Sequence, residues 1–266
     1  MKEKIISIIN QKGGVGKTTT VINLAAGLSL NNKKVLVIDL DPQGNATTGL
    51  GLSNIDQTSN SIYQVLIGTK KIDEAISKTN FSNLDIITSN VDLSGLEVET
   101  ADDGRRAFIL KEKLTAYLNN SRASYDYVLI DCPPSLSLLT VMALVASQSL
   151  LVPLQTEFFA LEGITQLIKT IDRIKVGLNP ELTIRGILLT MYDKRNKLSG
   201  EVETEARNYF KEKVYKNVVP RNVRLSEAPS HGMPVILYDK NCPGSKSYIN
   251  FTEEFLAQEE SFETAA

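Results

Sequence analysis

The N-terminal segment constrains the fold of this chain more than any other part of it. An apolar run at Ile5–Ile9 is followed by a glycine-rich stretch at Lys12–Thr19, and then by apolar residues at helical spacing from Val21 to Leu28. The first run is typical of a buried strand, and the spacing of the last is typical of an amphipathic helix. A strand that leads through glycines directly into a helix predicts an α/β protein built on a parallel sheet.

The glycine-rich stretch between this strand and helix has the chemistry to hold a triphosphate. Glycines let successive backbone N–H groups point inward, and the start of the helix adds free N–H groups and its dipole. Lys17 can reach the β- and γ-phosphates, and the Thr18 hydroxyl can ligate magnesium. The residues predicted to contact the nucleotide here are Lys12, Gly13, Gly14, Val15, Gly16, Lys17, Thr18 and Thr19.

Further apolar runs repeat the strand signal along the chain. They lie at Val35–Ile38, Leu84–Thr88, Val128–Ile130, Leu150–Pro153 and Ile184–Leu189. Most are rich in Ile, Val and Leu without alternation, as expected when both faces of a sheet are covered. Helical patterns lie between them, for example at Ile164, Ile168 and Ile171. We therefore expect a doubly wound, mostly parallel sheet with helices on both faces.

The domain organisation follows from the less regular stretches. Residues 51–81 are expected to form an insertion with one short helix at Ile62–Leu66, and residues 191–246 to mix polar loops with basic side chains. Residues 1–258 are predicted to form a single domain, and the acidic tail at residues 259–266 is expected to fray.

Acidic residues follow two of the predicted strands. Asp39 and Asp41 come after Val35–Ile38, and Asp131 comes after Val128–Ile130. Ligands of open parallel sheets bind at the carboxyl ends of the strands, so these carboxylates are predicted to lie near the glycine-rich loop. We assign Asp131 to magnesium, acting through water, and Asp41 to the metal region and to orienting the attacking water. Asp39 is predicted either to support the metal shell or to cap the next turn, and the sequence leaves both readings open.

Composition limits the possible partners and compartment. The formal net charge is -2, so any nucleic-acid binding must come from a local basic patch or from a surface assembled by oligomerisation. Cys132 and Cys242 form neither a disulfide framework nor a zinc spacing, which fits a reducing compartment. The N-terminus lacks signal-peptide features, and no apolar run is long enough to span a bilayer, so we expect a cytoplasmic protein.

The glycine-rich loop departs from the common G-x-x-x-x-G-K-[ST] pattern. Gln11 stands at the position of its first glycine, and an additional lysine, Lys12, precedes Gly13. This form resembles the deviant Walker A family of ATPases, which includes ParA, MinD and the nitrogenase iron protein. The resemblance implies a P-loop NTPase fold with ATP and Mg²⁺, and a Lys12 that reaches across a dimer interface to the partner's nucleotide. It makes Lys12, Lys17 and Asp41 the catalytic residues. We expect slow intrinsic turnover, because the chain shows no strong general base.

Three more blocks sharpen the resemblance. The segments Asp39–Thr47, Asp131–Ser135 and Pro220–Gly232 are similar to the ParA/Soj partitioning ATPases, and the similarity runs from Ile5 to about Phe255. It implies that ATP closes a sandwich homodimer, which binds double-stranded DNA without sequence preference. A ParB-type partner then stimulates hydrolysis and releases the protein. The ATP-bound form is accordingly expected on the nucleoid.

The resemblance also assigns residues outside the phosphate loop. Arg195 and Arg224 are implied to contact DNA, whereas Lys194, Lys197 and Arg221 are read as solvated charges. Pro220 and Asn222 match positions that line the adenine pocket, although Pro and Asn also favour turns. Lys12 carries a similar ambiguity, because an exposed lysine is often only solvated.

Other functions of the same family remain as alternatives. A MinD-like membrane ATPase needs a basic amphipathic C-terminal helix, whereas this tail is acidic, so no stable membrane association is expected. An iron–sulfur protein of the nitrogenase type needs thiolates at a shared cluster, and the two cysteines form no CxxC. A biosynthetic ligase or amidotransferase would need a substrate pocket without a clear signature here. His231 has no catalytic partner nearby in sequence and is read as structural.

Overall fold

The chain is built around a single twisted sheet. A computed structural model describes residues 4–52, 60–119 and 125–265, and within them the strand order is β3-β4-β2-β5-β1-β6-β7. The strands are β1 (Lys4–Ile8), β2 (Val35–Asp39), β3 (Ile76–Lys78), β4 (Leu84–Ile87), β5 (Tyr127–Asp131), β6 (Ser149–Gln155) and β7 (Thr183–Thr190). Only the pairing of the edge strand β3 with β4 is antiparallel.

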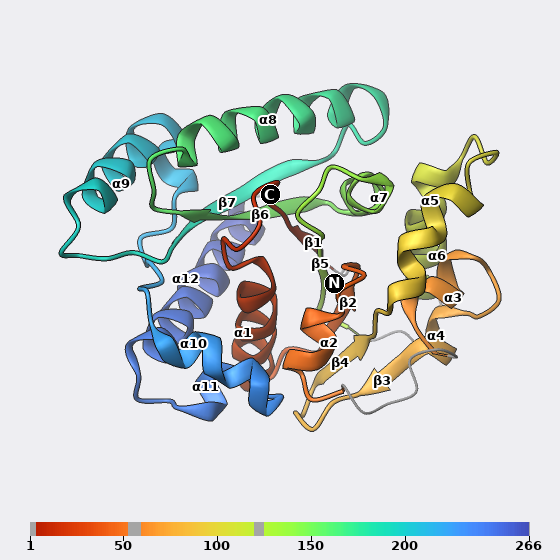
Figure 1. The fold of residues 1–266 in the computed structure, drawn as a ribbon, viewed down its shortest axis with the longest axis horizontal. Helices are drawn as coiled ribbons and strands as arrows, with labels where there is room; N and C mark the ends of the chain where they lie inside the picture. Colours follow the sequence, from red (N-terminus) through yellow and green to blue (C-terminus); the bar gives the residue numbers. More distant parts are fainter. Residues whose placement is uncertain (1–3, 53–59, 120–124, 266) are drawn as a thin grey trace.

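Helices cover both faces of the sheet, as Figure 1 shows for α8 above and α12 below strands β6 and β7. One layer contains α1 (Lys17–Leu30), α2 (Asn45–Gly49), α10 (Val223–Glu227), α11 (Val235–Tyr238) and α12 (Pro243–Ala265). The opposite layer contains α3 (Ile62–Leu66), α4 (Ile72–Ala75), α5 (Leu96–Glu99), α6 (Ile109–Leu118), α7 (Leu138–Ala146), α8 (Ala160–Gly177) and α9 (Lys197–Phe210). Short 3₁₀ turns lie at Val91–Gly95, Arg106–Phe108, Lys211–Lys213 and Ala228–His231.

Strand side chains alternate between two hydrophobic clusters. In β2, Leu36 and Ile38 join the layer of α7 and α8, while Val35 and Val37 join the layer of α1 and α12. All four side chains are fully buried. Because both faces are covered, the strand reads as a continuous apolar run rather than as an alternating one. The doubly wound fold predicted from sequence is therefore confirmed.

The predicted strands are all present, whereas the description of two loop regions was wrong. The expected short helix is α3, but residues 60–81 also contain α4 and the edge strand β3. Part of the expected insertion, residues 53–59, lies outside the described residues. Residues 191–246 contain the regular helix α9, which Asn196 caps by accepting a hydrogen bond from the Leu198 N–H.

The C-terminal tail was also expected to fray from residue 259; the structure shows that Glu259, its first residue, is buried, and the behaviour of the side chains after it stays a prediction. Helix α12 continues to Ala265, and Glu259 is 6% exposed. Its carboxylate forms ion pairs with Lys4 on β1 and Arg185 on β7, and the Arg185 guanidinium lies 4.2 Å from the ring centroid of Phe255. These contacts fix the end of α12 to the sheet. Across the parts of the chain that the structure describes, every helix falls short of the length or the hydropathy that a bilayer span requires.

Candidate functional site

The glycine-rich loop joins β1 to α1 at the carboxyl edge of the sheet. Gly14 and Gly16 have φ angles of 74° and 88°, a left-handed conformation that side chains with a Cβ rarely adopt. Two side chains hold the loop in place. Asn10 donates to the Pro153 carbonyl at 2.8 Å and accepts from the Lys12 N–H at 3.0 Å, and the Thr190 hydroxyl donates to the Val15 carbonyl at 2.8 Å. The loop is thus anchored to β6 and β7.

Lys17 is buried inside this loop. Its side chain curls back so that Nζ donates to the Lys12 carbonyl at 3.1 Å, and the residue is 7% exposed. Burial lowers the pKa of the Lys17 ammonium, while the nearby Asp131 carboxylate acts in the opposite direction. A buried cation beside a glycine-rich loop is suited to bind an anion, because the anion's charge offsets the desolvation of the lysine.

Lys12 points elsewhere. Its ammonium forms an ion pair with Glu157, which lies between β6 and α8, and its side chain is 46% exposed. The two lysines of the loop therefore differ: Lys17 is enclosed by the loop, and Lys12 stands at its open face. Lys12 is more than a solvated side chain, because its ammonium has a defined carboxylate partner in Glu157.

Asp131 carries a buried carboxyl group whose charged form is disfavoured by its surroundings. It ends β5 next to Asp39 of β2 in the strand register, and both carboxyl groups are fully buried. Within the described residues, neither carboxylate oxygen of Asp131 has a hydrogen-bond partner. Burial and then the charge of Asp39 raise the pKa of Asp131 well above its usual value, while the adjacent Thr18 and Lys17 side chains act in the opposite direction.

Asp39 and Asp41 have more local partners. Asp39 accepts hydrogen bonds from the Thr47 N–H at 2.8 Å, the Thr47 hydroxyl at 2.7 Å and the Asp41 N–H at 3.3 Å. Burial nevertheless raises the pKa of Asp39 to about 6. Asp41 is 7% exposed and accepts from the Gln43 N–H at 3.0 Å. Of the two readings left open for Asp39, the structure supports the cap, because its oxygens hold the first turn of α2.

These groups fit magnesium. Asp131 supplies buried carboxylate oxygens that lack internal donors, and the Thr18 hydroxyl lies beside them. Magnesium favours one or two protein oxygens together with phosphate oxygens and water. The described residues contain no cluster of three or more His, Cys, Asp or Glu side chains that could hold a metal. The oxygen donors at this edge thus come from Asp131 and Thr18.

Of the two residues predicted to line an adenine pocket, Pro220 lines a cleft beside the end of β7, whereas Asn222 is not among the lining residues of that cleft. Pro220 pairs with Tyr192 in an isolated parallel bridge, and both line a cleft of about 800 Å³. Asn222 caps α10, because its side-chain oxygen accepts from the Arg224 N–H at 3.1 Å. Asn222 therefore has a local role at the start of α10, in line with the preference of Asn for turns. Its side-chain oxygen accepts this hydrogen bond, and its side-chain nitrogen takes no part in it.

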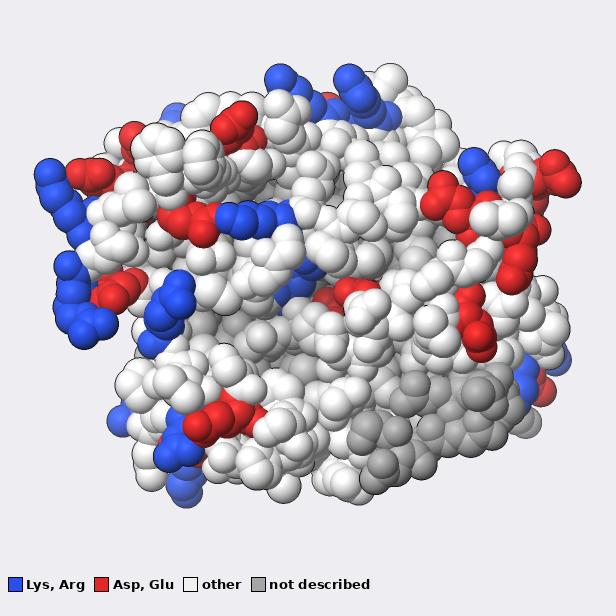
Figure 2. Space-filling model, in the orientation of Figure 1, with Lys and Arg blue, Asp and Glu red and all other residues white. Residues whose placement is uncertain are grey.

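The same cleft collects basic side chains from separate segments. Its lining includes Lys194, Arg195, Lys216, Arg221 and Lys246. Figure 2 shows several Lys and Arg on the left of the molecule, where α9 and α10 lie in Figure 1, with Asp and Glu among them, and acidic residues on the right around α5. Sequence reasoning missed Lys216 and Lys246, because only the fold brings them next to Arg195.

Both arginines assigned to DNA are paired with carboxylates of their own neighbourhood. Arg195 donates from Nε and Nη2 to Asp193 at 3.1 and 3.0 Å. Arg224 donates to Glu227 at 2.6 Å and lies 3.5 Å from Asp239. Arg195 is largely exposed and Arg224 half exposed. Exposed pairs of this kind are weak, so both guanidinium groups can exchange a carboxylate for a phosphate.

Comparison with known proteins places this site in a family. The family model described as an AAA domain matches residues 3–184. The chromosome partitioning protein ParA of Caulobacter vibrioides is 50% identical over 96% of this chain and 95% of the relative. This chain belongs to the ParA/Soj family. The sporulation initiation inhibitor protein Soj of Bacillus subtilis is 48% identical over 96% of this chain and 98% of that protein.

Solved structures with the same fold hold nucleotides. Cobyrinic acid a,c-diamide synthase from Mycobacterium smegmatis, with a bound ATP analogue and magnesium, has a TM-score of 0.85 and 32% identity, covering 97% of this chain and 96% of that one. The septum site-determining protein MinD of Pyrococcus horikoshii, complexed with Mg-ADP, has a TM-score of 0.77 and 27% identity, covering 95% and 96%. The P-loop NTPase fold of the ParA/Soj chain is thus shared with relatives of more than one function.

Other polar groups of the ParA/Soj chain are structural. Both cysteines are buried, and burial raises the pKa of the Cys132 thiol to about 12, so neither thiol stands at a surface where a shared cluster could form. The His231 ring stacks on Tyr238 with centroids 4.9 Å apart. This contact agrees with the structural role predicted for the histidine.

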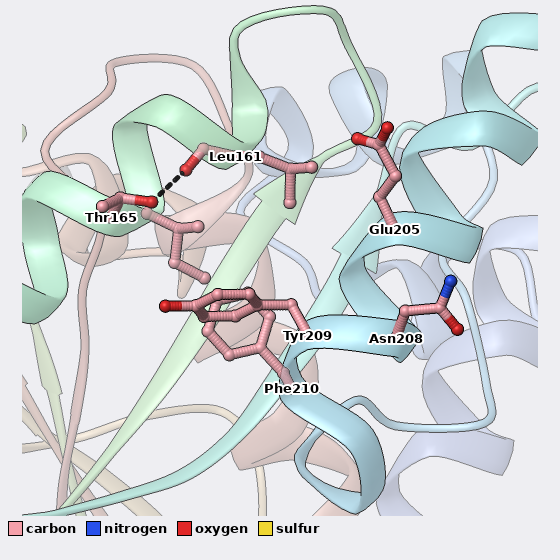
Figure 3. A pocket seen from close by; sticks show the side chains of 7 residues that line it. Leu161, Thr165, Glu205, Asn208, Tyr209 and Phe210 are labelled. Carbon is pink, nitrogen blue, oxygen red and sulfur yellow. Dashed lines mark hydrogen bonds between the residues drawn. The ribbon is translucent and has the colours of Figure 1, made fainter.

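A separate cavity of about 410 Å³ lies between α8 and α9. Figure 3 shows Leu161 and Thr165 of α8 on one side and Glu205, Asn208, Tyr209 and Phe210 of α9 on the other. None of these residues belongs to the phosphate loop or to the carboxylates of the ParA/Soj site. This cavity is therefore separate from the glycine-rich loop and the buried aspartates.

Proposed function

We propose that this chain is an ATP-driven DNA-partitioning switch. In the proposed cycle, ATP induces a sandwich homodimer that binds DNA without sequence preference, and a ParB-type partner stimulates hydrolysis and release. The observation that carries the proposal is the division of labour within the phosphate loop: Lys17 is enclosed by the loop, while Lys12 stands at its open face. One lysine serves the chain's own nucleotide, and the other, which is half exposed and paired with Glu157, can exchange that carboxylate for the phosphates of a second nucleotide.

Each group at the sheet edge has a defined task in hydrolysis. The loop N–H groups and Lys17 bind the β- and γ-phosphates and neutralise the charge that develops between them. Thr18 and Asp131 would hold magnesium, which supplies further positive charge to the phosphates when bound. Asp41 orients the attacking water. Because no strong base touches that water, we expect slow intrinsic turnover that a partner can raise.

DNA binding is proposed for the basic side of the molecule. Arg195 and Arg224 are the principal contacts, and the other cations of the cleft extend the same positive surface. Since the net charge of the chain is -2, this local patch is the part of the surface suited to phosphates. Two copies in a dimer double the number of contacts, which makes binding depend on nucleotide state.

Two other functions occur among proteins of this fold. MinD acts in septum placement, but the end of α12 is fixed here by the buried Glu259, which disfavours a free membrane-binding helix. The diamide synthase shares 32% identity, compared with 50% for the partitioning protein ParA of Caulobacter vibrioides. The higher identity over almost the full length favours partitioning.

The test is DNA retention in three nucleotide states. Labelled double-stranded DNA is immobilised, and the wild-type chain is passed over it with Mg-ATP, Mg-ADP or no nucleotide. We expect retention with ATP only, and equal retention on DNA of unrelated sequence. Vesicles of anionic lipid serve as the parallel surface. Binding to vesicles with ATP and none to DNA would replace partitioning by a membrane function, and binding to neither would favour a metabolic enzyme.

A further inference from the structure

The cavity between α8 and α9 is lined by matching stripes of side chains from the two helices. Each helix contributes residues at positions i, i+3 and i+4, and these are Leu161, Ile164 and Thr165 of α8 and Glu205, Asn208 and Tyr209 of α9. Residues at this spacing lie on one face of a helix. The two faces enclose a space of about 410 Å³, into which Figure 3 shows the Tyr209 ring extending toward α8.

Part of the lining is apolar and aromatic. Ile164 is buried, whereas the Tyr209 side chain on the opposite helix is largely exposed. The Tyr209 and Phe210 rings contact each other edge to face, with centroids 4.6 Å apart. The volume of the cavity falls within the roughly 300–1,000 Å³ that is usual for small-molecule sites, which combine apolar walls with a few polar groups.

The polar groups of the lining carry one sign of charge. Glu205 is the one charged side chain among the described residues that line the cavity, and no Lys or Arg shares this lining. Across the parts of the chain that the structure describes, the Glu205 carboxylate, the Asn208 amide and the Tyr209 hydroxyl form no hydrogen bond or ion pair with the protein. These groups are therefore available to a ligand, and their charge favours a cation.

We propose that this cavity binds a small organic cation in which a short chain joins an aromatic ring to a protonated amine. The ring packs against the aromatic and aliphatic side chains, and the ammonium pairs with Glu205. Glu205 precedes Tyr209 by one helical turn, and Cβ atoms at that spacing are roughly 5–6 Å apart, which suits a two-carbon chain. A cation beside the exposed tyrosine ring gains a further attraction to its face. A ligand carboxylate is instead repelled by Glu205.

Tryptamine, an indole ring that carries an ethylammonium group, is the probe. The protein contains no Trp, so the anisotropy of indole fluorescence reports on the probe alone when it is excited where tyrosine does not absorb. The full-length protein is titrated into tryptamine at neutral pH, with and without saturating Mg-AMPPNP. Two related indoles test the charge of the ligand: tryptophol, in which an alcohol replaces the amine, and indole-3-acetate, which is an anion.

Two cavity variants test the assigned residues. Glu205→Gln removes the charge and Tyr209→Ala removes the ring, and because both side chains are exposed the fold loses little packing. The matched control is Glu181→Gln, which neutralises an exposed carboxylate between α8 and β7, beyond the end of α8 that is remote from the cavity. Circular dichroism checks that all three variants are folded.

We expect saturable binding of tryptamine to the wild type and to Glu181→Gln, with no change in Mg-AMPPNP. Each cavity variant should raise the Kd for tryptamine about fivefold, and tryptophol and indole-3-acetate should bind the wild type at least about fivefold more weakly than tryptamine. Absence of saturable tryptamine binding, equal binding of the three indoles, or a cavity variant that binds as the control does would each overturn the proposal. Displacement of tryptamine by Mg-AMPPNP would also overturn it, because the probe would then lie in the nucleotide site.

Discussion

Replacing Asp131 by Asn should make the nucleotide-free protein more stable and at the same time disable the site. The Asp131 carboxylate is fully buried beside Asp39, and within the described residues neither of its oxygens has a hydrogen-bond partner. Asn has nearly the same shape, removes the buried charge and keeps a side-chain oxygen beside the Thr18 hydroxyl. Burial and Asp39 are the two largest influences on the pKa of Asp131, and both oppose its charged form. Removing the charge should therefore increase the free energy of unfolding.

The size of the effect follows from the cost of an unsatisfied buried group. That cost is about 1–3 kcal/mol and larger for a charge, so we take about 2 kcal/mol for the stabilisation at pH 8. For a chain of this size such a change raises Tm by roughly 4–8 °C. A raised pKa means that the folded carboxyl keeps its proton at a higher pH than the unfolded one. The contribution of protonated Asp131 to the free energy of unfolding is therefore fully present below the usual pKa of 3.8. It is lost as the pH rises through the raised pKa of the folded state.

Thermal unfolding followed by circular dichroism measures both parts of this prediction. In EDTA, Asp131→Asn should melt above the wild type at pH 8, and the difference should shrink toward pH 4. With Mg-AMPPNP, the wild type should gain stability by mass action, and the variant should gain far less. Asp172→Asn, at an exposed position on α8, is the control for loss of one negative charge. A variant no more stable than the wild type at pH 8 would refute the strained-carboxylate reasoning.

Further substitutions separate binding, hydrolysis and DNA contact. Lys17→Ala should weaken Mg-ATP binding by about 10–100-fold, from the loss of charged hydrogen bonds, in a fluorescent-nucleotide titration; unchanged affinity would contradict the phosphate-loop assignment. Asp41→Ala should bind ATP normally but hydrolyse it at least about 100-fold more slowly in a phosphate-release assay, and an unaltered rate would remove Asp41 from the water-orienting role. Arg224→Ala should flatten the log–log salt dependence of DNA binding by roughly 1.8 per dimer, and an unchanged slope would place Arg224 outside the interface.

The sequence predicted the central strands and the phosphate loop well because their signals are local. Val35–Ile38 is apolar at every position since both faces of β2 are covered, and Gly14 and Gly16 stand where the backbone needs positive φ. The edge strand β3 has only three residues and is stabilised by its pairing with β4. It is too short to show a periodic pattern in the sequence. Helix α9 buries only Ser199, Val202 and Ala206. Because most of its other residues are polar, the sequence shows no clear apolar pattern at helical spacing there.

Parts of the site depend on tertiary contacts that no local pattern contains. The Lys12–Glu157 ion pair joins loops 145 residues apart, and the basic cleft brings Lys246 of α12 next to Arg195. The burial of Glu259 against Lys4 and Arg185 could not be predicted from the acidic composition around it, which suggests solvent exposure. The pairing of Asp39 with Thr47 likewise required the geometry of α2, eight residues further along the chain.

Binding of ATP at the phosphate loop underlies every other step of the account, and equilibrium dialysis measures it directly. The wild-type chain is dialysed against labelled ATP with Mg²⁺, and again with EDTA. We predict saturable binding of about one nucleotide per chain that weakens strongly when the metal is removed. Absence of saturable binding in the presence of Mg²⁺ would contradict the nucleotide site, and with it the dimer and the DNA cycle.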